Sequence, residues 1–187
     1  KLKADDSRID INKIKETDLS FPKLTGGYIT KADKNEGSDT PAWYMDSYGW
    51  GQVNYIHEHP KPTTVKFQQN EYIKNEFEKL EVSASQGNSS ITSGYPSVID
   101  IPSFVDFMIL NELASNADGY QFSTFFHKDR NGKLRAGPIW DFNLTFGNDL
   151  FDFGFDRSKT YLWQFEYENM GTKFWTDLFN DSVFKCY

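Results

Sequence analysis

Two aspartates that flank a predicted β-hairpin are the residues of this chain best placed to do chemistry. Asp118 precedes a strand-like run over residues 122–128, and Asp141 follows a second run over residues 133–140. An Asn-Gly pair lies between the two runs and is typical of a tight hairpin turn. Antiparallel register then places residues 120–122 opposite Asp141, so both carboxylates should lie at the same end of the hairpin.

Two carboxylates in one place can divide two tasks between them. One can accept a proton as a general base, and the other can bind Mg²⁺, which prefers oxygen ligands and often takes one or two carboxylates together with substrate phosphates. The same residue types allow a structural explanation, in which Asp118 caps a turn and Asp141 accepts backbone hydrogen bonds. The spacing alone leaves both explanations open.

Three further motifs could carry chemistry, and each has a plain structural alternative. Asp152-Phe153-Gly154 matches the sequence of a known metal-binding tripeptide. It lies among other acidic residues in an irregular stretch, however, which favours a solvated loop. His57-Glu58-His59 alternates possible metal ligands, yet a solvated loop is the simpler interpretation without a third histidine or a cysteine pair. The aromatic residues between 43 and 50 could stack on a carbohydrate, with core packing as the competing interpretation.

Helical and strand patterns supply the scaffold for these residues. One apolar stripe over residues 64–81 predicts an amphipathic surface helix. Pro102 opens a second helix that is apolar on nearly all sides up to Ala114, so we expect it to be buried, with Glu112 paired through its neighbours. The remaining segments are short strands and turns over 1–33, a long irregular loop over 34–62, a Ser/Gly-rich linker over 83–94, an irregular aromatic stretch over 141–170, and a helix from about Thr172.

The composition describes a folded, acidic chain of one or at most two domains. Its 187 residues are 17% aromatic, which is too many for a disordered chain. The formal net charge of -7 argues against nucleic acid as a partner, because binding a phosphate backbone takes clustered Lys and Arg. No apolar run approaches the roughly 20 residues needed to cross a bilayer. The single cysteine, Cys186, excludes an internal disulfide and a cysteine-based metal site.

Both ends of the sequence look internal to a longer protein. The chain begins at Lys1 without an initiator methionine, and it stops at Tyr187 inside a segment with helical apolar spacing. We therefore expect a fragment of a longer protein.

Several spaced motifs agree in order with those of one known family. They are Ile101-Pro102-Ser103-Phe104, Asn111-Glu112-Leu113, Asn116-Ala117-Asp118-Gly119, Phe126-His127-Lys128-Asp129 and Gly137-Pro138-Ile139-Trp140-Asp141-Phe142. The chain resembles the spore-coat CotH family of atypical protein kinases with a divergent kinase-like fold, most densely from about 95 to 148. The resemblance implies an α+β fold: a mostly helical larger lobe over 63–187 with a central hairpin over 122–140, and remnant strands of a smaller lobe over 1–33.

The resemblance also implies an activity, namely transfer of the γ-phosphate of ATP to Ser or Thr of a partner protein with Mg²⁺, or Mn²⁺, as the metal. Asp118 would be the catalytic base and Asp141 the metal ligand. Asn116, Ser123 and Asn143 would contact the cofactor. A bacterial secreted or cell-surface protein, or a spore-coat protein, is implied as well, and we expect a monomer that acts on a protein substrate or surface partner.

Three departures from the pattern keep other functions open. Ser123 stands five residues after Asp118, where ordinary kinases carry a metal-binding Asn, and Asn143 stands where the family commonly has Asp. No Gly-rich loop with an accompanying Lys is visible, so we expect the phosphate-binding strands upstream of Lys1 and an inactive fragment. The alternatives are a secreted or surface adhesion or assembly protein that keeps the fold without catalysis, and a glycan-binding surface protein.

Overall fold

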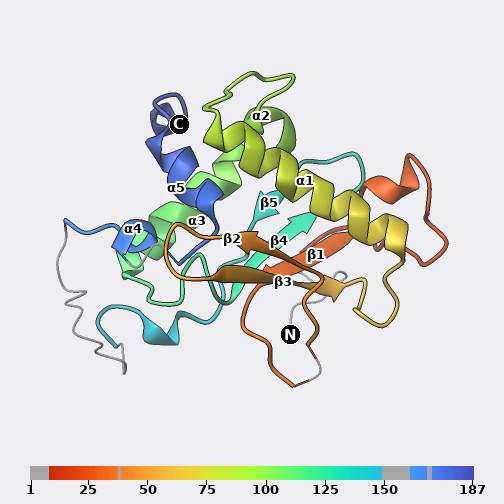
Figure 1. Ribbon diagram of the computed structural model, residues 1–187, viewed down its shortest axis with the longest axis horizontal. Coiled ribbons are helices and arrows are strands. Elements are labelled where there is room, and N and C mark those ends of the chain that lie inside the picture. Colours follow the sequence, from red (N-terminus) through yellow and green to blue (C-terminus); the bar gives the residue numbers. More distant parts are fainter. Residues whose placement is uncertain (1–8, 38, 149–160, 168–169) are drawn as a thin grey trace.

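The computed structural model describes residues 9–37, 39–148, 161–167 and 170–187 (Figure 1). Its sheet contains β1 (Tyr28–Ala32), β2 (Trp43–Asp46), β3 (Gln52–His59), β4 (Thr124–Lys128) and β5 (Arg135–Ala136). The helices are α1 (Phe67–Ser85), α2 (Tyr95–Val98), α3 (Ile101–Ala114), α4 (Gln164–Tyr167) and α5 (Lys173–Asn180), with short 3-10 turns η1 (Lys23–Thr25), η2 (Phe142–Leu144) and η3 (Phe184–Cys186). The predicted α+β class is confirmed. None of the helices in this part of the chain has the length and apolar character that crossing a membrane requires.

Strand β1 occupies the middle of the antiparallel sheet, whose order is β2-β3-β1-β4-β5. Lys31 of β1 lies opposite Ile56 of β3 on one side and Phe125 of β4 on the other. Of the short strands expected over 1–33, the described residues contain only β1, and it belongs to the same sheet as the central hairpin. The expectation of one irregular loop over 34–62 is wrong, because this segment contains β2 and β3. In β3 exposed Gln52 and half-buried Asn54 alternate with buried Val53 and Tyr55, the pattern of a strand.

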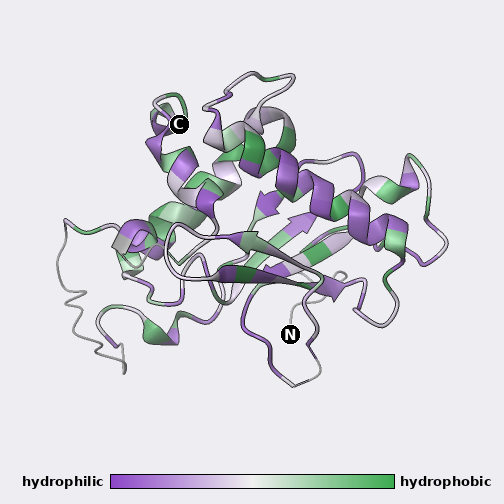
Figure 2. Cartoon of the chain, viewed as in Figure 1, coloured by the Kyte–Doolittle hydropathy of each residue, from purple (hydrophilic) through white to green (hydrophobic). Residues whose placement is uncertain are grey.

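The hydrophobic core lies between the sheet and the helices, and Phe126 of β4 is at its centre. Its ring centroid is 5.1–6.2 Å from those of five aromatic side chains contributed by β3, α1, α3 and α5, namely Tyr55, Phe77, Phe104, Phe174 and Trp175. Figure 1 shows α1 running across the sheet, and Figure 2 shows mostly hydrophilic residues on the visible side of α1. The amphipathic surface helix predicted around residues 64–81 is therefore confirmed.

Helix α3 begins at the predicted position but is not buried on all sides. The side chain of Asp100 caps its N-terminus by accepting a hydrogen bond from the backbone N of Ser103 at 3.1 Å. Ile109, Leu110 and Leu113 are 57%, 43% and 70% exposed. The expectation of full burial is wrong because, within the described part of the chain, β5, α4 and the rings of α5 cover only one face of α3.

Glu112 on α3 is the paired carboxylate that the sequence predicted. It accepts hydrogen bonds from the Tyr120 hydroxyl at 2.6 Å and from the backbone N of Gln164 at 2.6 Å. Burial raises the pKa of Glu112, although these hydrogen bonds act in the opposite direction. Glu112 thus ties α4 and the chain around Tyr120 to α3.

The hairpin forms with the predicted register, but its second strand is short. Phe126 pairs with Ala136, and His127 pairs with Arg135. Gly137 has φ +103°, and Pro138 has no backbone N–H to offer a neighbouring strand, so the chain leaves the sheet after Ala136 instead of continuing to residue 140.

Replacing Phe126 by Ala should lower the free energy of unfolding by about 3–5 kcal/mol, because it opens a cavity between five aromatic rings. Urea denaturation monitored by circular dichroism measures the change. Phe67→Ala on α1 is the matched control: Phe67 is 76% exposed, and its loss should change stability by no more than about 0.5 kcal/mol. Equal effects of the two substitutions would contradict this account of the core.

Candidate functional site

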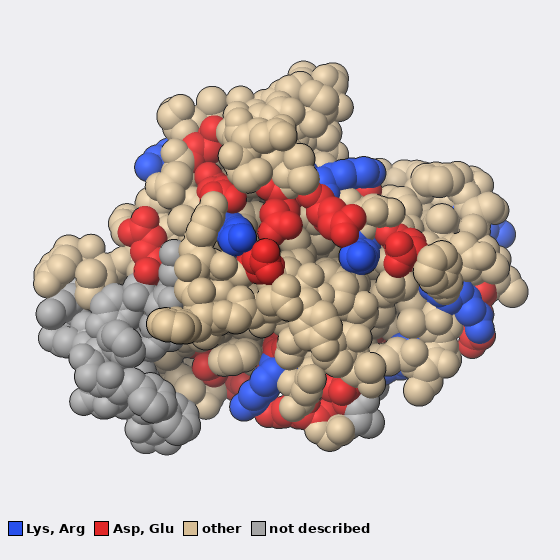
Figure 3. Space-filling model, viewed as in Figure 1, with Lys and Arg blue, Asp and Glu red and all other residues tan. Residues whose placement is uncertain are grey.

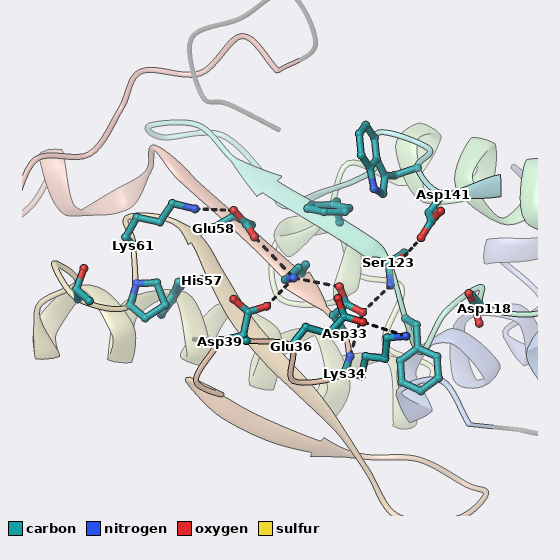
Figure 4. Close-up of a pocket in the computed structure, with 17 residues that line it drawn as sticks. Asp33, Lys34, Glu36, Asp39, His57, Glu58, Lys61, Asp118, Ser123 and Asp141 are labelled. Atoms are coloured by element: carbon teal, nitrogen blue, oxygen red, sulfur yellow. Dashed lines mark hydrogen bonds and ion pairs between the residues drawn. The ribbon is translucent and has the colours of Figure 1, made fainter. Parts of the chain in front are cut away.

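A pocket of about 690 Å³ lies on the face of the sheet opposite α1. Successive side chains of a strand point to opposite faces, so Phe126 enters the core while Phe125 points the other way, as does its cross-strand neighbour Lys31. Phe125 lies beneath the exposed ring of Trp140, with the two centroids 6.4 Å apart. Among the described lining residues are six carboxylates and three lysines (Figure 4), contributed by Asp33, Glu36, Asp39, Glu58, Asp118 and Asp141 and by Lys31, Lys34 and Lys61.

Lys31 is a buried cation at the floor of this pocket. Its Nζ lies 2.9 Å from Asp39 Oδ2, 3.1 Å from Asp33 Oδ2 and 3.7 Å from Glu58 Oε1. Burial by itself would lower the pKa of Lys31, but the hydrogen bonds and negative charges of Asp39 and Asp33 outweigh it and raise the pKa. The ammonium group is therefore held in its charged form.

Asp118 reaches the pocket from the loop that follows α3. Ser115 ends the helix with the left-handed backbone conformation, φ 48°. Asn116 is buried beneath the loop, where its Nδ2 donates to Asn111 Oδ1 at 2.7 Å and its Oδ1 accepts from the backbone N of Asp118 at 3.3 Å. A buried amide pair thus fixes the position of Asp118.

Asp141 reaches the same pocket from the segment after the hairpin. Its Oδ2 accepts a hydrogen bond from Ser123 Oγ at 3.3 Å. Asp141 and Ser123 both have left-handed backbone conformations, φ 59° and 48°, an unfavourable state for residues other than glycine that is often found at functional sites. With its amide nitrogen facing the acceptors around it, Asn143 donates hydrogen bonds to Oδ1 and to the backbone carbonyl of Asp141.

The site residues proposed from the sequence are only partly gathered in this pocket. Asp118, Ser123 and Asp141 all line it, and Figure 4 shows Ser123 next to Asp141, with Asp118 at the same end of the pocket. Asn143 touches Asp141, whereas the side chain of Asn116 is occupied beneath the Asp118 loop. Their roles stay predictions.

Sequence reasoning missed Lys31. We expected the phosphate-binding lysine upstream of Lys1, yet Lys31 lies in the pocket with Asp118 and Asp141. The available signal was a lysine inside the strand Tyr28–Ala32, in which every residue is buried, because a buried ammonium demands carboxylate partners.

The other motifs do not form sites of their own within the described residues. His57 is buried and bonds Asn70 at 3.0 Å, Glu58 faces Lys31, and His59 lies 3.3 Å from the Ile14 carbonyl. Strand alternation separates Glu58 from His57, and the two histidines bind different partners. Trp43 packs in the core, whereas Tyr44, Tyr48 and Trp50 are exposed, and Asp152-Phe153-Gly154 lies outside the described residues.

Magnesium fits the donor atoms of this pocket, although no group of three or more His, Cys, Asp or Glu ligands is preformed in the described part of the chain. Mg²⁺ commonly takes only one or two protein carboxylates and completes its shell with water and substrate phosphates. Asp141 offers such a carboxylate at the rim, where it is exposed and hydrogen-bonded to Ser123.

Acidic side chains also gather on the face seen in Figure 3, over α1 and α5. Glu81 has its pKa raised first by burial and then by nearby carboxylates that include Asp46 and Asp177, against a lowering effect of Lys173. Lys173 pairs with Asp46 at 3.4 Å. This second region of negative charge is formed by side chains other than those lining the pocket.

Residues 5–185 match the family model described as CotH kinase protein. The chain belongs to the CotH family. Searches of curated proteins and of solved structures found no match. The motifs that carry the CotH resemblance fall on α3, the Asp118 loop, the β4–β5 hairpin and the segment up to Asp141. Of these, the Asp118 loop, β4 and the segment at Asp141 contribute residues that line the pocket.

Lys31→Met should lower the free energy of unfolding by about 3 kcal/mol, because it leaves three carboxylates facing one another without their buried cation. Lys34→Met is the control in the same pocket: the Lys34–Glu36 pair is 63% and 66% exposed, and its loss should cost no more than about 1 kcal/mol. Urea titration measures both. A Lys31 variant as stable as the Lys34 variant would disprove the structural importance of the buried cation.

Proposed function

We propose that this CotH-family chain carries the phosphoryl-transfer site of an ATP-dependent protein kinase that phosphorylates Ser or Thr of a partner protein. The observation that carries the proposal is that a buried lysine and two aspartates from separate segments line one pocket, namely Lys31, Asp118 and Asp141. Kinases need these three kinds of group: a cation for the phosphates, a base for the attacking hydroxyl and a carboxylate for the metal.

Each of the three residues has a role that its surroundings support. Lys31, held charged by its carboxylates, contacts the nucleotide phosphates. Asp118 accepts the proton of the substrate hydroxyl as the new O–P bond forms and the bond to the ADP leaving group breaks. Asp141 provides a metal ligand, and bound Mg²⁺ would neutralise charge on the phosphates and orient them.

The neighbouring polar residues orient these groups. Ser123 Oγ and the Asn143 amide hold the Asp141 carboxylate from two sides. Asn116 acts on the backbone of Asp118 and so sets the position of the base. We include in the proposal a bacterial secreted, cell-surface or spore-coat location, which family resemblance alone supports.

Because the proposal assigns to Lys31 the cation that we expected upstream of Lys1, it makes this chain active instead of an inactive fragment. Asp118→Asn should then reduce phosphate incorporation by about 10²–10⁴-fold, the usual contribution of a general base, and Asp141→Ala should reduce it to background. The assay uses labelled ATP, Mg²⁺ and a degenerate library of Ser- and Thr-containing peptides as acceptors. Asp106→Asn on the exposed side of α3 is the control and should leave incorporation unchanged.

Thermal unfolding of each variant distinguishes a catalytic loss from a folding loss, because Asp141 is exposed and does not belong to the core. Full incorporation by Asp141→Ala would remove this residue from the mechanism. Wild-type protein that transfers no phosphate with either Mg²⁺ or Mn²⁺ would instead favour a binding function, for which Trp50, 87% exposed beside Tyr48, is the leading surface feature.

A further inference from the structure

Asp33 connects the two ends of the pocket. It lies just beyond the end of β1, and its side chain is only 15% exposed. One carboxylate oxygen, Oδ2, lies 3.1 Å from Lys31 Nζ. The other, Oδ1, accepts hydrogen bonds from the backbone N of Ser123 at 3.4 Å and from that of Lys34 at 3.0 Å. Each oxygen of this carboxylate thus serves a different part of the site.

Ser123 carries the connection on to Asp141. Its backbone N binds Asp33, and its Oγ donates to Asp141 Oδ2 at 3.3 Å (Figure 4). Its left-handed backbone, φ 48°, is unfavourable for serine and persists only where surrounding contacts fix it. The bond from Asp33 is one such contact, and it aims the Ser123 hydroxyl at Asp141.

The other carboxylates around Lys31 have a different placement. Asp39 and Glu58 reach the ammonium group at 2.9 and 3.7 Å. Figure 4 shows both on the side of the pocket away from Ser123, and Glu58 pairs there with Lys61 at 2.7 Å. They neutralise the lysine, whereas Asp33 neutralises it and also holds the segment that touches Asp141.

We propose that Asp33 is a positioning residue that couples the phosphate-binding lysine to the metal-binding aspartate through Ser123. This inference rests on the proposed function, because it assigns Asp141 to the metal and Lys31 to the phosphates. The coupling fixes the separation of the two groups, so that one metal–nucleotide complex can engage both. Replacing a residue that hydrogen-bonds to a metal ligand and orients it typically lowers metal affinity 10–100-fold.

The test measures Mn²⁺ binding to the nucleotide-free protein by the electron paramagnetic resonance signal of free Mn²⁺. Asp33→Asn and Asp33→Ala remove the same charge, but only Asn keeps an acceptor for the Ser123 N–H. We expect Mn²⁺ to bind Asp33→Ala about tenfold more weakly than Asp33→Asn. The matched pair Asp39→Asn and Asp39→Ala also removes one charge beside Lys31, and its two members should agree within about twofold.

Equal Mn²⁺ affinities of the two Asp33 variants, or a similar difference within the Asp39 pair, would overturn the coupling. Asp33→Leu, similar in shape to Asn but without an acceptor, replaces Asp33→Ala if the latter does not fold. Asp141→Asn separates the two hypotheses. If Asp141→Asn still binds Mn²⁺, or if the wild type binds none, both the metal assignment and the coupling fail. If Asp141→Asn abolishes Mn²⁺ binding while the two Asp33 variants bind equally well, only the coupling fails.

Discussion

A single buried ammonium group constrains the organisation of this site. Lys31 sits on the central strand, and a charge in that position is tolerated only if carboxylates surround it. They come from the end of β1, from the loop that follows and from β3, as Asp33, Asp39 and Glu58. The ion pairs that compensate the charge of Lys31 therefore hold together several segments that line the pocket.

The aromatic core makes this polar arrangement rigid from the other side of the sheet. Phe126 packs among five rings, while its neighbour Phe125 faces the pocket, so one short strand serves the core and the site at once. The Asp118 loop enters β4 and the hairpin returns from it toward Asp141. Both aspartates are consequently tied to β4, which packs against the aromatic core, and Ser123 can orient the Asp141 carboxylate.

The sequence predicted those parts of the site that depend on local geometry. Hairpin register relates residues on either side of one turn, so the convergence of Asp118 and Asp141 followed from counting residues. The position of Lys31 depends on the pairing of β1 with β4, which lie far apart in the chain and carry no mark of their partnership. Strand β3 was missed for a different reason. The alternation around Val53 and Tyr55 was visible in the sequence, but the Gly and Pro residues around it favoured the interpretation as a loop. The exposed face of α3 could not be predicted, since apolar residues indicate burial without indicating whether a neighbour is present.

The central place of β1 also affects how the chain folds. Tyr28 pairs with Lys128, about one hundred residues later, whereas β2 and β3 join through a short turn and β3 pairs with β1 at moderate separation. During synthesis the three early strands can assemble first, and β1 is then an open edge until β4 has been made. An open edge offers unpaired backbone groups to other chains, and a long-range pairing closes slowly. The site is therefore completed late, and until β4 is made Lys31 lies on a strand edge that is open to pairing with other chains.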